Sequence, residues 1–151
     1  MLGPAKHPHV RLDSHDGWAE LVLNRPAKLN AMNAALVAEL NAALSSVGET
    51  VRCLLLRAEG RAFCAGRDLA DARPGEDAAR VLTETFNPLV QRLADLPVPT
   101  IAAVQGACLG TGLGLALACD VLIVATDAKL GSPFARIGAV LDSGAHLAFV
   151  Q

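Results

Sequence analysis

Residues 100–125 read TIAAVQGACLGTGLGLALACDVLIVA, and this stretch decides the fold. It opens with a short apolar run typical of a buried strand, passes through a glycine-rich turn and continues into further apolar runs. We predict a strand over residues 100–104, a glycine turn, a short helix over residues 113–119 and a buried strand over residues 121–125. A strand that is followed by a helix and another strand favours parallel pairing, so the stretch predicts an α/β fold.

The same region carries no charged side chain between Asp95 and Asp120, which raises the possibility of a transmembrane helix. Prolines, polar residues and glycines interrupt the run, and the Lys, Arg and aromatic anchors of a membrane span do not flank it. We therefore interpret the region as the interior of a globular domain and expect no membrane partner.

The alternation of strands and helices continues outward toward the N-terminus. Residues 18–24 alternate apolar and polar side chains, as a half-buried strand does. Asn33 can cap a helix with leucines at helical spacing, and residues 51–58 have the apolar run of a buried strand. A second helix is expected from about Glu76, with a kink at Pro88. This order strengthens the prediction of a mainly parallel sheet.

Length and composition bound the class of protein. A chain of 151 residues suits a single domain, which we take as residues 1–151, and 52% hydrophobic residues exclude a disordered chain. The net charge is −2, Lys and Arg are scattered, and 3% of residues are aromatic, so nucleic acid is not expected as a partner. The N-terminus has no apolar signal-peptide core, which predicts a cytoplasmic protein.

Neither the cysteines nor the N-terminal histidines form a metal motif. The four cysteines contain no C-x-x-C pair, so we expect reduced thiols in the core. His7 and His9 lie in a tail that we expect to be solvated, and we predict no metal site.

Two glycine turns are the candidate functional elements. The turn at residues 110–114 fails the dinucleotide pattern because residue 115 is Leu, and no Walker A motif is present. It can present amide hydrogens to an anion, or it can serve close packing of a helix on a strand. Residues 63–69 (FCAGRDL) also follow a predicted strand and could present amide hydrogens in the same way. Alternatively, they form an ordinary loop in which the charges of Arg67 and Asp68 are solvated. Two such turns together predict an oxyanion hole, which needs donors from separate segments.

A third motif, residues 131–144 (GSPFARIGAVLDSG), contains Asp142 after three apolar residues. From its neighbours alone, Asp142 is either a helix cap or a buried acid. Ser143 and His146 could form a nucleophile and base, but the G-x-S-x-G motif is missing from the sequence.

With these motifs the chain resembles the crotonase superfamily, the enoyl-CoA hydratases and isomerases. Three blocks carry the resemblance in order: WAELVLNRPAKLNAMN at residues 18–33, GRAFCAGRDL at residues 60–69, and residues 97–144. The resemblance implies a spiral of ββα units that stops before the family's C-terminal helical segment, so the domain is incomplete. It also implies an acyl-CoA thioester ligand and a homo-oligomer, a trimer or hexamer in the full-length protein.

The resemblance also implies site residues. The backbone amides of Arg67 and Thr111 would form the oxyanion hole, and Asp142 would be the catalytic acid–base. The residues implied in binding substrate or CoA are Lys28, Ala65, Gly66, Arg67, Asp68, Leu69, Ala70, Gly110 and Gly112.

The branch of the superfamily depends on three positions. Hydratases of this family carry two glutamates where this chain has Gly114 and Phe134, whereas Asp142 matches the 1,2-epoxyphenylacetyl-CoA isomerase-like members of the phenylacetate pathway. One acid can move a proton from C2 to C4 of a thioester through an enolate, without a metal or redox cofactor and with coenzyme A as part of the substrate. The alternatives are a hydratase, an aroyl-CoA dehalogenase and a CoA-binding or assembly module without activity.

Overall fold

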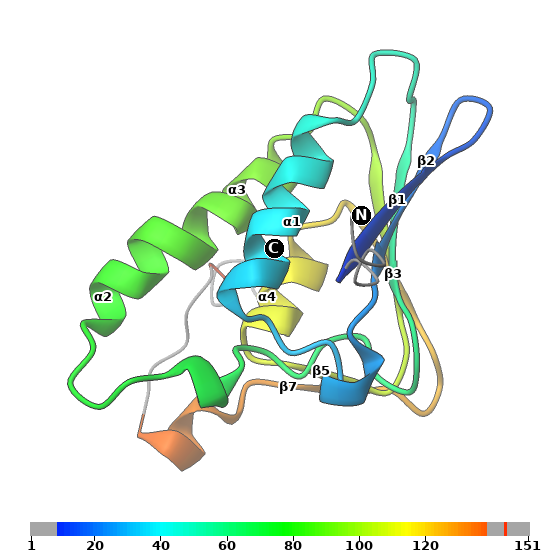
Figure 1. Ribbon diagram of the computed structural model, residues 1–151. Helices are drawn as coiled ribbons and strands as arrows, with labels where there is room; N and C mark the ends of the chain where they lie inside the picture. The colour runs from blue at the N-terminus through cyan, green and yellow to red at the C-terminus, as the bar shows by residue number, and fades with distance from the viewer. Residues whose placement is uncertain (1–8, 139–143, 145–151) are drawn as a thin grey trace, which may run out of the picture.

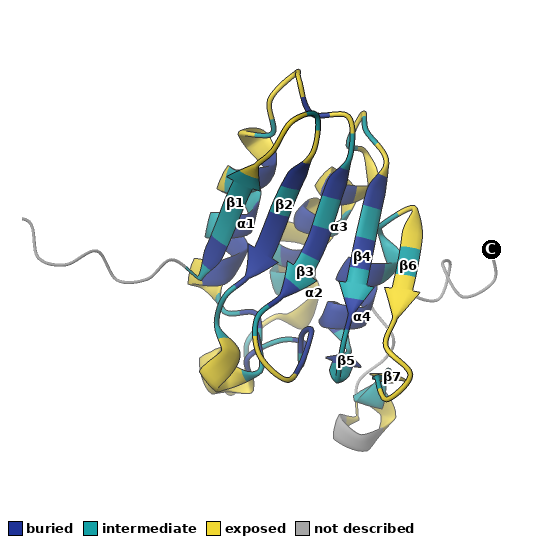
Figure 2. Ribbon diagram, turned by 90° about the vertical axis from the view of Figure 1, so that its right-hand side faces the viewer, coloured by how far each residue is buried: buried dark blue, intermediate teal, exposed yellow. Residues whose placement is uncertain are grey.

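The computed structural model describes residues 9–138 and residue 144. A five-stranded sheet has helices packed on one face, as Figures 1 and 2 show. Its strands, in spatial order, are β1 (Val10–Ser14), β2 (Ala19–Leu23), β3 (Leu54–Ala58), β4 (Thr100–Val104) and β6 (Val121–Val124). β1 is antiparallel to β2, and the other neighbouring strands are parallel. The predicted α/β class with a mainly parallel sheet is confirmed.

The helices follow the strands in turn. They are α1 (Ala34–Ser45), α2 (Ala78–Val81), α3 (Asn87–Ala94) and α4 (Thr111–Leu117), with 3-10 turns η1 (Pro26–Lys28), η2 (Leu69–Asp71) and η4 (Pro133–Ile137). The Asn33 side chain accepts the Leu36 N–H at 2.9 Å, so α1 begins at the predicted cap. A π-helical turn, η3 (Leu82–Phe86), joins α2 to α3. It lies just before Pro88, which lacks an N–H, at the position where the sequence predicts a kink.

A second, smaller layer crosses the carboxyl ends of the main strands. It contains the parallel strands β5 (Ala107–Leu109) and β7 (Lys129–Gly131). Isolated parallel bridges join Cys64 to Cys108 and Met32 to Arg67, so the segment after β3 belongs to the same layer. Each turn of the chain thus adds a strand to the main sheet, a segment to the small layer and then a helix. This arrangement is the predicted spiral of ββα units.

Some elements differ from the prediction. Strands β1, β5 and β7 are not predicted by the sequence pattern, and α4 begins at Thr111 rather than at residue 113. The strand expected to be buried, β6, is an edge strand, with Val121 48% and Ile123 58% exposed (Figure 2). An apolar run does not distinguish a central strand from an edge strand, because the composition is the same until the neighbouring strand is known.

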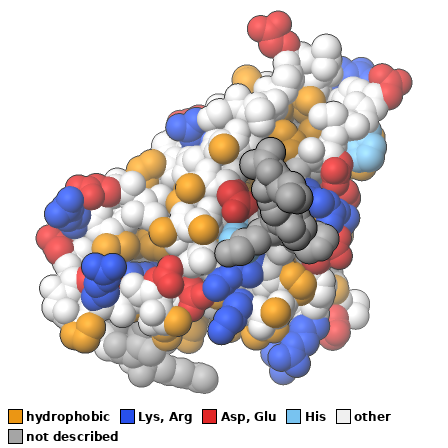
Figure 3. All heavy atoms as spheres, viewed as in Figure 1, with side chains coloured by type: hydrophobic (Ala, Val, Ile, Leu, Met, Phe, Trp, Pro, Cys, Tyr) orange, Lys and Arg blue, Asp and Glu red, His pale blue; other side chains and the backbone are white. Residues whose placement is uncertain are grey.

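The predictions for cysteine, histidine and charge can also be compared with the structure. All four cysteines are free, and burial raises the pKa of the Cys64 and Cys108 thiols to about 12. His9 bonds Glu39 at 2.8 Å, and His7 lies outside the described residues. Acidic and basic side chains are interspersed on the face in Figure 3. Within residues 9–138, no helix is long and apolar enough to cross a membrane.

Candidate active site

The two glycine turns touch each other. A Cβ on Gly66 would lie 2.8 Å from the Leu109 carbonyl oxygen, and a Cβ on Gly112 would lie 2.7 Å from the Cys64 carbonyl oxygen. Gly66 also has a φ of +93°, which other residues rarely adopt. Glycine is required at both positions because the two backbone segments pack directly on one another.

The amide of Arg67 is left unpaired by its strand geometry. In a parallel bridge the residue opposite supplies both hydrogen-bonding groups: Met32 donates to the Gly66 carbonyl at 2.8 Å and accepts from the Asp68 amide at 2.9 Å. The N–H of Arg67 therefore points away from Met32. No hydrogen bond among the described residues uses it.

The amide of Thr111 also has no hydrogen-bond acceptor within the described residues, for a different reason. Thr111 is the first residue of α4, and the first N–H groups of a helix have no partner within it. The carbonyl of Gly110 accepts from Leu113 and Gly114 at 3.0 and 3.1 Å, and the Gly110 N–H donates to Gly131. Two unpaired amides on touching turns can together hold one negatively charged oxygen.

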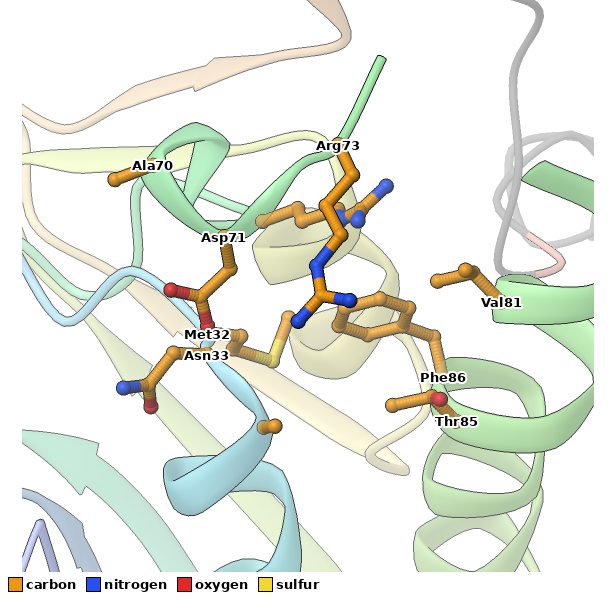
Figure 4. A pocket seen from close by; sticks show the side chains of 10 residues that line it. Met32, Asn33, Ala70, Asp71, Arg73, Val81, Thr85 and Phe86 are labelled. Carbon is orange, nitrogen blue, oxygen red and sulfur yellow. The ribbon is translucent and has the colours of Figure 1, made fainter. Parts of the chain in front are cut away.

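An open cavity of about 480 Å³ lies beside the first turn. It is lined by Met32, Asn33, Ala34, Arg67, Ala70, Asp71, Arg73, Val81, Thr85 and Phe86. Figure 4 shows Met32 and Phe86 extending toward each other from opposite walls, with Arg73 pointing inward from the rim. The cavity is lined by both apolar and charged side chains, which suits an extended ligand with apolar and polar parts.

The Arg67 side chain is used separately from its amide. Its guanidinium pairs with the Glu76 carboxylate at 2.5 Å, and both side chains are mostly buried. The hydrogen bond from Arg67 holds the pKa of Glu76 below its usual range, so this pair stays ionic at neutral pH. The pair ties the first turn to the loop before α2, and the Arg67 amide stays available.

The structure separates the residues that the resemblance assigned to CoA. Arg67 and Ala70 line the cavity. Leu69 lies between them in sequence but is 64% exposed and is not part of the lining. Lys28 is exposed at the end of η1, where its charge acts on the Asp68 carboxylate rather than on the cavity. Ala65, Gly66, Gly110 and Gly112 belong to the touching turns.

The two positions where hydratases carry glutamates can be placed. Gly114 is buried in α4. The ring of Phe134 lies 3.6 Å from the position that a Cβ on Gly110 would occupy, so it covers the second turn. Three predicted residues lie outside the described part of the chain: Asp142, Ser143 and His146.

The sequence analysis missed several residues of the cavity wall. Phe86 lies on a helix and Met32 in the segment after β2, and no local sequence pattern links the two. Asp71 and Arg73 carried no motif at all. The spacing of Phe86 within its helix indicated burial, but residues 54 positions apart meet through tertiary packing, which local patterns do not report.

A spiral of ββα units with two touching glycine turns is the architecture of crotonase-like proteins. The family described as enoyl-CoA hydratase/isomerase matches residues 13–151, and the chain belongs to this family. A probable enoyl-CoA hydratase of Rhodobacter capsulatus is 43% identical over 136 residues, which are 89% of this chain and 53% of that protein. A 1,2-epoxyphenylacetyl-CoA isomerase of Escherichia coli is 43% identical over 135 residues, 85% of this chain and 52% of that protein.

Solved structures agree with the fold. The crystal structure of a putative enoyl-CoA hydratase/isomerase from Mycobacterium abscessus has a TM-score of 0.86 and 36% identity, and the match covers 93% of this chain and 57% of that chain. An enoyl-CoA hydratase/isomerase from Xanthobacter autotrophicus has a TM-score of 0.83 at 37% identity, covering 90% of this chain and 53% of its own. The chain spans about half the length of the curated relatives it matches.

Proposed function

We propose that the protein is an acyl-CoA isomerase, which shifts a double bond or rearranges an enoyl or ring-epoxide thioester through an enolate. The observation that carries this proposal is the pair of unpaired amides, Arg67 and Thr111, on touching turns. Such donors stabilise the oxygen on which charge develops when a thioester loses its C2 proton. The proposed ligand is an acyl-CoA thioester, with the cavity taking the thioester arm. The resemblance places Lys28 near the CoA entrance, which would then lie outside the cavity lining.

The mechanism requires one acid–base group. In a 3-enoyl thioester, the Asp142 carboxylate takes a proton from C2, and the bonding electrons move onto the carbonyl oxygen held by Arg67 and Thr111. The carbonyl then re-forms as the electrons return to make a double bond between C2 and C3, while the electrons of the former C3–C4 double bond take the proton of the protonated Asp142 at C4. No electron is gained or lost, so the proposed reaction requires no redox cofactor, and the two amides stabilise the enolate oxygen in place of a metal ion.

Isomerisation is favoured over hydration by the groups beside the second turn. Hydration needs acids that activate water and deliver its proton, but Gly114 has no side chain and Phe134 is apolar. The Phe134 ring packs against Gly110, so this position brings an apolar ring rather than an acid to the second turn. The isomerase name of the Escherichia coli relative supports the same choice.

Hydration is the second candidate, because the Rhodobacter capsulatus relative, which has the same 43% identity to this chain, is described as a probable enoyl-CoA hydratase. The test offers the complete protein a 3-enoyl-CoA and, separately, a 2-enoyl-CoA in water. We expect the double bond of the first to shift. Formation of a 3-hydroxyacyl-CoA from the 2-enoyl-CoA, without any double-bond shift in the 3-enoyl-CoA, would contradict the isomerase proposal.

A cytoplasmic location and a homo-oligomer stay predictions of the sequence.

The role of Asp142 has its own test. Asp142→Asn removes the base and is expected to lower kcat by roughly 10²–10⁴-fold with little loss of ligand affinity. Ser143→Ala changes the adjacent residue and is the matched control, expected to retain activity. If Asp142→Asn keeps normal turnover and loses about 1 kcal/mol of stability, Asp142 is a helix cap instead.

A further inference from the structure

An ion pair buried beside the first glycine turn has no role in the chemistry proposed above. The Arg25 guanidinium lies 2.6 Å from an Asp68 carboxylate oxygen, with side-chain exposures of 17% and 12%. Neither residue lines the cavity. Arg25 follows β2, whereas Asp68 follows β3, so the pair joins two successive turns of the spiral.

Each partner of the ion pair makes a further bond that fixes the backbone. The same Nη1 atom of Arg25 donates to the Ala31 carbonyl at 2.9 Å. The other carboxylate oxygen of Asp68 accepts the Ala70 N–H at 3.1 Å, which begins η2 at the cavity wall. The pair therefore cross-links the segment that contains Met32 to the residues just after Arg67.

This cross-link acts on the bridge that orients the Arg67 amide. Met32 bonds the Gly66 carbonyl and the Asp68 amide, so the direction of the Arg67 N–H depends on how closely the two segments align. Backbone bonds alone leave room for the segments to slide or tilt. A buried, charge-assisted bond at the end of the bridge restricts that motion.

The charges around the pair keep it ionic at neutral pH. The hydrogen bonds from Arg25 and from the Ala70 amide, together with the charges of Arg25 and Lys28, hold the pKa of Asp68 below its usual range. The Arg25–Asp68 ion pair is therefore fully formed at neutral pH.

We propose that Arg25 and Asp68 are positioning residues that hold the Arg67 N–H in the direction required to stabilise the enolate oxygen. The inference rests on the proposed function, because it assigns the pair a role in that reaction. A donor that is fixed in advance stabilises a developing charge without reorganising, whereas a donor that must be aligned loses part of that benefit. The expected signature is a fall in kcat at nearly constant KM.

The test uses the complete protein and a double-mutant cycle. Asp68→Asn keeps an acceptor for the Ala70 amide but removes the charge, and Arg25→Gln removes the cation. We expect each change to lower kcat roughly 10- to 100-fold, as small misplacements of catalytic groups do, and the double variant to be no slower than the single ones. Arg25→Lys keeps a cation at this position and should retain more activity than Arg25→Gln. If Arg25→Gln folds poorly, Arg25→Lys takes its place in the comparison.

A matched control lies on the outer face of the sheet. The Arg57–Glu20 pair has the same 2.6 Å separation and similar partial burial, but it is not at the glycine turns. Glu20→Gln should lower stability without changing kcat. If Asp68→Asn also changes stability alone, measured at a temperature where both variants are folded, the positioning role is wrong.

A spectroscopic measurement reports on the oxyanion site without turnover. A saturated acyl-CoA labelled with ¹³C at the thioester carbonyl should show its infrared carbonyl band shifted to lower frequency when bound, and less shifted in Asp68→Asn. An equal shift in both proteins overturns the inference. A bound, shifted thioester without isomerase activity would contradict the proposed reaction but leave the positioning role supported by the Asp68→Asn difference. A protein that binds no thioester would overturn both.

Discussion

At the scale of single residues, the site depends on two glycines that are required for different reasons. Gly66 has a φ of +93°, so its backbone shape favours glycine before any contact is considered. Gly112 has no such constraint. It must be glycine because a Cβ there would lie within 2.8 Å of the Cys64 Cβ, carbonyl oxygen and Sγ. The closeness of the two turns therefore depends on missing side chains.

Gly112→Ala is expected to push the second turn away from the first. Overpacking of a filled interior costs about 1–3 kcal/mol of stability, and kcat should fall with the separation of the two amides. Denaturant unfolding and steady-state turnover measure the two effects. Gly48→Ala is the control, because a Cβ there meets nothing within 4 Å, and stability should change by about 0.5 kcal/mol or less. Equal effects at both positions would contradict close packing of the turns.

At the scale of elements, the sequence reported what is local. The Asn33 cap and the strand before Arg25 each depend on neighbours within a few residues, and both were predicted. The bridge between Met32 and Arg67 joins segments 35 residues apart, and no periodic pattern encodes it. The three-residue strands β5 and β7 are likewise too short for a period. The two glycine turns could be predicted, but the cavity walls could not.

The connection between the turns of the spiral is expected to depend on pH. The pKa of Asp68 is lower in the folded protein than in the unfolded chain, where Asp titrates near about 3.9. Its contribution to stability is therefore complete above that value and is lost as the pH falls through the lower, folded pKa. Asp68→Asn has no such proton to bind, so its melting temperature should fall less steeply on acidification from pH 5 to about pH 2.

Thermal melts across this pH range check the expectation. Asp127→Asn, at an exposed position after β6, is the control and should follow the wild-type profile. If the Asp68→Asn and wild-type profiles stay parallel, the ion pair with Arg25 contributes nothing to acid stability.

At the scale of the whole molecule, the two ends of the outer sheet face differ. Near β2 and β3, Arg57 pairs with Glu20 and Glu59, so charged side chains cover the sheet. At the other end, β6 exposes Val121 and Ile123, and its outer edge pairs with no strand in the described part of the chain (Figure 2). An exposed apolar edge strand is a template for pairing with another chain.

The 151-residue chain by itself is therefore expected to associate in solution through β6. Light scattering should show a mass that rises with concentration, and Ile123→Lys should reduce association, because a lysine on the edge strand opposes strand pairing. Leu69→Lys is the control: Leu69 is 64% exposed but lies in η2, away from the sheet edge, so association should be unchanged. A monodisperse monomer at all concentrations, or equal effects of the two lysines, would show that β6 is not the surface through which copies of the chain meet.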